Sequence, residues 1–230
     1  MKKDYYIIEK NVDKIIRGES TNFLDPNISN KVRDKLKGYA FQIYYPYKDS
    51  DKTIIYTDKL PKIKLLEIIT KKPIKHNEIL GSLFGLNIEN EMFGDIIINN
   101  DHYYVLIMNK VYYLIINEFN MVGNNYIKIR EVPLDTLNTY QRKYKEITLI
   151  VSSLRIDTII SRLIGKSRHE VKKKFLNDEV ILNYESCHKI NYNLNPNDIF
   201  SIRKHGKYKF GDITEKTKKG SYIIKLYKYT

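Results

Sequence analysis

The stretch LRIDTIISRLIGKSRHEVKKKF, residues 154–175, predicts two short helices joined by a tight turn. From Ile156 to Ile164 the apolar residues recur at i, i+3, i+4, i+7 and i+8, the spacing of one face of an amphipathic helix. Gly165 follows directly, and helices often end on a glycine. Ser167 and Glu170 form a Ser-x-x-Glu capping box, which predicts the start of a second helix.

The second helix carries positive charge on its outer side. Val171 and Phe175 are spaced to face inward, whereas Arg168 and Lys172 share another side one turn apart, and Lys173 adds charge beside them. Such a surface suits the phosphates of folded RNA, which Lys and Arg bind without reading bases. The alternative is an ordinary solvated helix face, which is the commoner meaning of a bare run of charges.

Charge is unevenly distributed along the chain. The 230 residues carry a net charge of +13, and residues 151–230 supply +9 of it against +4 from residues 1–150. A basic domain favours a polyanionic partner such as nucleic acid. Abundant Lys, Asn, Ile and Tyr throughout could instead reflect a biased genome, but that would not explain the asymmetry.

Several classes of protein are excluded by composition. No apolar run reaches the ~18–20 residues of a membrane span, and the N-terminus lacks the apolar segment of a secretory signal. The single cysteine, Cys187, fits a reducing cytosol, so we expect a cytoplasmic protein. The five histidines show no zinc spacing, and no metal or cofactor is expected.

The alternation of patterns predicts an α+β protein with three parts. Residues 1–72 read as an N-terminal mixed α/β segment that ends with a strand at Ile63–Ile69. Residues 73–142 read as helix, strand, strand, helix and strand, which fits a small ferredoxin-like or RRM-like sandwich. Residues 133–146 are polar and read as a linker, and residues 147–230 form the basic C-terminal domain, with short strands after the two helices.

Ordered submotifs in the last third resemble the S4-type RNA-binding domain, also called the αL motif. They are L-R-I-D-x-x-I (154–160), S-R-x-x-V (167–171), V-I-L-N (180–183), N-D-I-F-S-I (197–202) and R-K-H-G-K (203–207). The resemblance implies an S4-type domain with a C-terminal β extension over 147–230. It also implies RNA contacts or a flanking role for Arg155, Ser167, Arg168, Lys172, Lys173, Arg203, Lys204 and Lys207, and a turn shaped by Asn183.

Two positions depart from the S4 pattern. Asn197 stands where a glycine is usual, and Asn still tolerates a left-handed backbone. Tyr184 follows the turn residue Asn183, where glycine is common.

Upstream motifs extend the resemblance to the YlmH family over nearly the whole chain. They are N-F-L-D-P (22–26), H-N-E-I-L-G-S-L-F-G-L (76–86), F-G-D-I (93–96) and G-D-I-T-E-K-T-K-K-G (211–220). This resemblance implies a bacterial, cytoplasmic RNA-binding protein of ribosome-associated quality control. Such proteins bind large ribosomal subunits that still carry peptidyl-tRNA and support template-free elongation of the stalled chain. Links to cell division have also been proposed for the family.

The N-terminal part departs from the family more than the C-terminal part does. Asn77, Asn87 and Asn90 stand at positions where the family often has Arg, Gly and Arg. A basic family stretch is reduced to G-Y-A-F-Q-I at 38–43. We therefore expect most of the binding to ribosomal RNA and tRNA to rest on the C-terminal domain, in a monomeric protein.

A catalytic alternative centres on Asp157, because pseudouridine synthases use an Asp in an R-L-D setting and often carry an S4-type domain. Asp157 also lies in the first turn of the predicted helix, where its charge is favourable and could orient Arg155 or Arg168. No glycine-rich nucleotide loop follows a strand. We expect a protein that is not an enzyme, with an RNA-modifying enzyme or its accessory subunit, and a cell-division scaffold, as alternatives.

Overall fold

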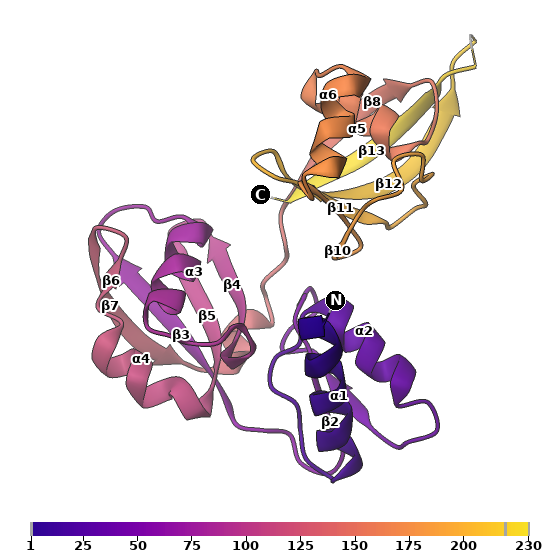
Figure 1. Ribbon diagram of the computed structural model, residues 1–230. Helices are drawn as coiled ribbons and strands as arrows, with labels where there is room; N and C mark the ends of the chain where they lie inside the picture. Colours follow the sequence, from indigo (N-terminus) through magenta and orange to yellow (C-terminus); the bar gives the residue numbers. More distant parts are fainter. Residues whose placement is uncertain (1, 219, 230) are drawn as a thin grey trace. The chain divides into compact units, whose positions relative to one another are not determined.

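The computed structural model describes residues 2–218 and 220–229, so Lys219 of the C-terminal motif lies outside the described residues. The chain divides into two compact units, Met1–Gln141 and Arg142–Thr230 (Figure 1). Each mixes helices with antiparallel sheet, so the α+β class is confirmed.

The N-terminal unit begins with two helices and a small hairpin. Helices α1 (Lys2–Ile16) and α2 (Pro26–Lys35) pack together, and β1 (Gln42–Tyr44) pairs with β2 (Ile54–Tyr56). Their shared core joins buried aliphatic side chains: Ile8, Val12, Ile15, Leu24, Val32, Leu36 and Ile55. The helical spacing seen in the sequence therefore points into a real core.

A five-stranded antiparallel sheet forms the rest of this unit, with strand order β4-β5-β3-β7-β6. The elements are β3 (Ile63–Thr70), α3 (His76–Gly85), β4 (Phe93–Asn99), β5 (His102–Met108), α4 (Tyr112–Glu118), β6 (Met121–Val122) and β7 (Asn125–Val132). Without the short β6, they follow a βαββαβ succession. Strand β3, which sequence analysis placed in the segment 1–72, hydrogen-bonds to both β5 and β7 and is the centre of this sheet.

Each face of this sheet is covered by a different part of the chain. Helices α3 and α4 cover one face through buried Ile79, Leu83 and Ile115. Phe23 and Tyr47, from the segment before β3, lie against the other face in a core that includes residues of β3 and β5. The N-terminal segment and the sheet therefore share a core.

Gly94 and Asp95 of the F-G-D motif hold this packing together. A Cβ at position 94 would lie 2.9 Å from both Leu106 Cβ and Phe23 Cε1, so only glycine fits without movement. The Asp95 carboxylate accepts hydrogen bonds from the Tyr47 hydroxyl at 2.7 Å and the Asp51 amide at 2.8 Å. These contacts explain two of the motif positions by packing alone.

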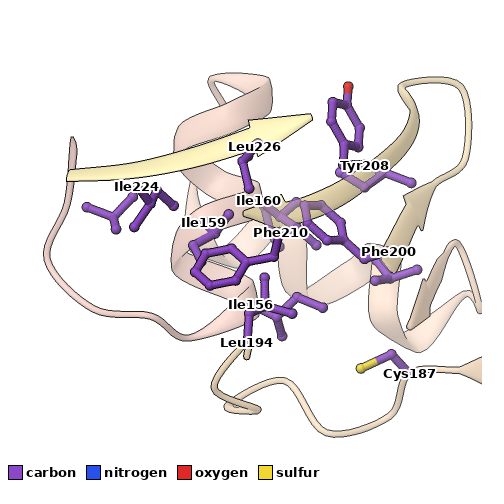
Figure 2. Packing of buried hydrophobic residues seen from close by; sticks show 14 of the residues in the cluster. Ile156, Ile159, Ile160, Cys187, Leu194, Phe200, Tyr208, Phe210, Ile224 and Leu226 are labelled. Carbon is purple, nitrogen blue, oxygen red and sulfur yellow. The ribbon is translucent and has the colours of Figure 1, made fainter. Parts of the chain in front are cut away.

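The C-terminal unit is a six-stranded antiparallel sheet with two helices, in strand order β10-β9-β11-β12-β13-β8. Its elements are β8 (Tyr144–Val151), α5 (Ile156–Ile164), α6 (Arg168–Leu176), β9 (Val180–Leu182), β10 (Glu185–Ser186), β11 (Ile199–Ile202), β12 (Gly206–Lys216) and β13 (Tyr222–Tyr229). Figure 2 shows Ile156, Ile159 and Ile160 of α5 meeting Phe210 and Leu226 of the sheet.

The two helices cover one face of this sheet. Alternate side chains of β12 and β13, including Phe210 and Leu226, are buried beneath them. Residues between these positions must point to the opposite face, because side chains alternate along a strand.

The sequence underestimated the strands at both ends of this unit. Strand β8 begins at Tyr144, inside the stretch read as a linker, because it pairs with β13 along its whole length. Strands β12 and β13 form one long hairpin, where the sequence indicated short strands at 208–210 and 223–227. A register shift follows Phe210, so the period-2 pattern is interrupted there.

Candidate nucleic-acid interface

The predicted ends of α5 and α6 are confirmed. Gly165 has φ of 65°, the left-handed conformation that ends α5, and nothing lies within 4 Å of the place a Cβ would take. The Ser167 hydroxyl accepts from the Glu170 amide at 3.2 Å, and the Glu170 carboxylate accepts from the Ser167 amide at 3.0 Å. The hydrogen bonds from Ser167, with Lys166 beside them, lower the pKa of Glu170 from 4.5 to about 2.

Arg155 is held by Asp157. Its Nε and one terminal nitrogen donate to the two carboxylate oxygens at 3.0 and 2.9 Å. The Asp157 side chain is only 6% exposed, whereas that of Arg155 is 41% exposed. Half of the Arg155 fork is thus used within the protein, so Arg155 offers less free charge than the resemblance implied; its other N–H groups remain available as donors.

Thr158 links the two helices beside this pair. Its hydroxyl accepts from Arg168 at 3.1 Å and is bonded to the Ser153 hydroxyl at 3.0 Å. The contact fixes the Arg168 guanidinium without neutralising it. Lys172 lies one turn further along α6, and Lys172 and Lys173 are exposed without an ion-pair partner among the described residues.

A shallow open hollow of about 440 Å³ lies between the ends of α5, α6 and β8. Three cationic residues line it, Arg162, Lys166 and Arg168, together with the Thr158 and Ser161 side chains and Gly165. Sequence reasoning missed Arg162 and Lys166, although Arg162 falls one helical turn after Thr158 on the polar side of α5. We call Arg155, Arg162, Lys166, Arg168 and Lys172 the α5–α6 face.

Arg203 and Lys204 lie elsewhere on the unit. They occupy the turn between β11 and β12, where the Arg203 amide donates to the Glu179 carbonyl at 2.9 Å. Lys174 pairs with the Glu179 carboxylate at 2.9 Å, and its hydrogen bond, with the nearby charges of Arg203 and Lys204, lowers the pKa of Glu179. Lys174 and Lys172 flank the buried stripe of α6 on opposite sides. The structure therefore separates this group from the α5–α6 face.

Asn183 shapes a tight turn. Asn183 and Tyr184, at φ of 48° and 70°, form the two-residue connection between β9 and β10, as in a type I′ hairpin. The Asn183 side chain donates to Asp198 at 2.8 Å and accepts from the Ile199 amide at 2.9 Å. Asn197, at φ of 74°, adopts the left-handed backbone that its sequence position predicts.

Lys207 lies on the face of the sheet turned away from the helices, because its neighbour Tyr208 is buried in the helix-covered core. Its ammonium group lies over the rings of Tyr184 and Tyr229, at 4.7 and 4.6 Å from their centroids. The nine residues implied by the S4 resemblance thus occupy three separate places, with Arg155, Ser167, Arg168 and Lys172 forming the largest continuous group.

Other chemical features are limited. Cys187 is buried in the core, and burial raises the pKa of its thiol. Over residues 2–218 and 220–229, no group of three or more His, Cys, Asp or Glu side chains is placed to hold a metal ion. Among the helices in those ranges, none is long and apolar enough to span a membrane.

Comparisons with known proteins agree with the resemblance drawn from the sequence. Residues 61–136 match the family described as "Putative RNA-binding domain in YlmH". The chain is similar to "Ribosome-associated protein quality control protein P2" of Bacillus subtilis (strain 168), with 22% identity over 226 residues that span 93% of this chain and 88% of the relative.

A solved structure supports the fold. The "Cell division protein ylmH from Streptococcus pneumoniae" is similar over 60% of this chain and 93% of that chain, with a TM-score of 0.50 and 16% sequence identity. At this identity the likeness concerns the fold alone. Together with the family match and the curated relative, it confirms the resemblance to YlmH proteins.

Proposed function

We propose that this YlmH-like chain is a non-catalytic RNA-binding protein of ribosome-associated quality control. It binds ribosomal RNA on stalled large subunits that retain peptidyl-tRNA, and supports continued extension of the nascent chain. The observation that carries this proposal is the α5–α6 face, where Arg162, Arg168 and Lys172 surround or adjoin an open hollow. The relatedness to a quality-control protein over 93% of the chain supplies the biological setting.

The architecture of the C-terminal unit supports its assignment as an S4-type domain. Two short helices joined at Gly165 pack on an antiparallel sheet, and Asn183 forms a hydrogen-bonded turn at the submotif V-I-L-N. The hairpin β12–β13 and its pairing with β8 would be the C-terminal β extension.

The βαββαβ succession supports an RRM-like or ferredoxin-like domain within residues 63–132. Its open sheet face, where RRM domains stack bases, is partly covered here by Phe23 and Tyr47. The buried Glu67 on that face is already paired with Arg130 and His102. These contacts favour placing most of the RNA binding on the C-terminal unit.

The mechanism is recognition by charge and shape. The Arg168 guanidinium is fixed by Thr158 before RNA arrives, so little side-chain order is lost on binding. Phosphate contacts of this kind position a protein on RNA and weaken as salt rises. Binding one state of the subunit and tRNA more tightly than others stabilises that state without making or breaking a bond. A cytoplasmic monomer suffices for this role.

A catalytic role for Asp157 is disfavoured by its surroundings. Its carboxylate is buried and accepts hydrogen bonds from Arg155 and from the Thr158 amide at 2.9 Å. A general base or nucleophile needs access to substrate, which these contacts deny. The contacts fit the alternative reading of Asp157 as the residue that orients Arg155.

Co-sedimentation with purified large ribosomal subunits tests the proposal. Unmodified protein should pellet with the subunits and be released as salt increases. The variant Arg168→Glu/Lys172→Glu should stay in the supernatant while melting normally. A control with the same charge change, Lys189→Glu/Lys218→Glu, alters exposed lysines outside the α5–α6 face and should still pellet. Equal pelleting of both variants would overturn the proposed surface.

A further inference from the structure

The outer face of the C-terminal sheet carries a cluster of tyrosines and lysines that the α5–α6 face does not include. The cross-strand pairs Tyr229↔Tyr144 and Tyr227↔Glu146 connect β13 to β8, and Lys209↔Tyr227 connects β12 to β13. Side chains of directly paired residues lie on the same face of a sheet. We call Tyr144, Tyr227, Tyr229, Lys207 and Lys209 the tyrosine–lysine patch.

The patch lies on the side of the sheet opposite α5 and α6. Its β12 and β13 members alternate with Tyr208, Phe210 and Leu226, which are buried beneath the helices. Tyr144 is 41% exposed, and Tyr227 and Tyr229 are half-buried. Large aromatic side chains are therefore displayed to solvent where packing against the core does not require them.

The rings are arranged as a cluster. Tyr144 meets Tyr229 edge-to-face at 5.1 Å between centroids and Tyr227 at 6.2 Å. Lys207 lies over Tyr229, and Arg142 also lies over that ring, 5.2 Å from its centroid. These contacts hold the rings and cations in place before any ligand arrives, which lowers the entropy cost of binding.

The charge on this face favours an anionic partner. Lys207, Lys209, Lys225 and Arg142 surround the tyrosines, and the acidic side chain on the paired strand, Glu146, forms an ion pair with Lys225 at 2.9 Å. Aromatic rings set among unneutralised cations are the features of surfaces that bind single-stranded nucleic acid. There, bases stack on the rings and phosphates meet the cations.

We propose that the tyrosine–lysine patch is a second RNA site that takes unpaired nucleotides of a single strand. Paired bases cannot reach the rings, so the patch discriminates against duplex. Each stacked base needs one ring face, and Tyr144 and Tyr227 are the members over which no cation is placed among the described contacts. The site is independent of the α5–α6 face, because the two lie on opposite faces of one sheet.

The test uses the full chain and a fluorescent oligouridylate of about 12 nucleotides, a length suited to one small domain. Fluorescence anisotropy should show that Tyr144→Ala/Tyr227→Ala weakens binding by on the order of tenfold or more. The matched variant Tyr144→Phe/Tyr227→Phe keeps both rings and should bind within about twofold of the unmodified protein. Arg168→Gln/Lys172→Gln should retain oligouridylate binding while losing large subunits, which separates this site from the proposed function.

A second measurement guards against misfolding of the alanine variant. The unmodified protein is irradiated with an oligomer containing 4-thiouridine, and peptides carrying the crosslink are identified by mass spectrometry. Adducts on Tyr144, Tyr227 or Tyr229 are expected. Adducts confined to α5 and α6, or equal binding by the alanine and phenylalanine variants, would overturn the proposal and leave the patch to a protein partner.

Discussion

Arg155 and Asp157 form a two-point ion pair at the start of α5, with distances of 3.0 and 2.9 Å and the carboxylate buried. The pair accounts for the R-I-D sequence without catalysis. It also means that the RNA surface does not consist of free charges alone. One arginine is spent partly on holding the helix start, while Arg162, Arg168 and Lys172 remain charged around the hollow.

Asp157→Asn should destabilise the C-terminal unit by about 1–3 kcal/mol, because it removes a buried charged partner of Arg155. Urea unfolding monitored by circular dichroism measures the loss. Asp178→Asn, at a side chain that is 61% exposed, is the control and should change stability by less than about 0.5 kcal/mol. A silent Asp157→Asn would contradict the structural role given to this residue.

The capping box predicts a defined pH dependence. Because the pKa of Glu170 is lowered from 4.5 to about 2, its contribution to stability is complete above pH 4.5 and is lost as the pH falls toward 2. Glu170→Gln should therefore melt below the unmodified protein at pH 7 and approach it near pH 2. Glu215→Gln, at an exposed strand position, is the control. A melting difference independent of pH would refute the ionic part of the cap.

Gly94→Ala should destabilise the N-terminal unit by about 1–3 kcal/mol, because the added methyl would press against Leu106 and Phe23 at 2.9 Å. Gly81→Ala is a matched control in α3, where nothing lies within 4 Å of the new methyl. Since alanine favours helix, that control should be neutral or stabilising by up to about 1 kcal/mol. Thermal melting compares them, and equal melting temperatures would contradict the packing described.

Asn183 offers a test of turn against RNA contact. Asn183→Gly keeps the left-handed backbone but loses the bonds to Asp198 and Ile199, so we expect a loss of about 1–2 kcal/mol. Asn183→Val adds backbone strain and should cost more. If Asn183 acts through the turn, the folded Gly variant should bind RNA normally. A large loss of RNA affinity in the stable Gly variant would instead indicate direct contact.

The sequence predicted the C-terminal helices well because their signals are local. The apolar spacing from Ile156 to Ile164, the glycine turn and the Ser167–Glu170 box each depend on residues within one or two turns of each other. The turn at Asn183 and the left-handed Asn197 were also foreseeable, since backbone preference is a property of the residue itself.

Long-range pairing could not be predicted in the same way. Strand β3 belongs to a sheet with β5 and β7 because of partners tens of residues away, and β8 extends into a polar stretch because β13 pairs with it. The candidate site was partly missed for the same reason. Arg162 and Lys166 are ordinary surface cations in the sequence, and only the folding of α5, α6 and β8 places them around one hollow.

The salt dependence of binding to large ribosomal subunits tests the central claim most directly. We predict that Arg168→Gln/Lys172→Gln weakens binding and makes the plot of log affinity against log salt shallower, since fewer counterions are released when fewer phosphates are contacted. Lys189→Gln/Lys218→Gln should leave both affinity and slope unchanged. An unchanged slope and affinity in Arg168→Gln/Lys172→Gln would show that the α5–α6 face does not contact RNA.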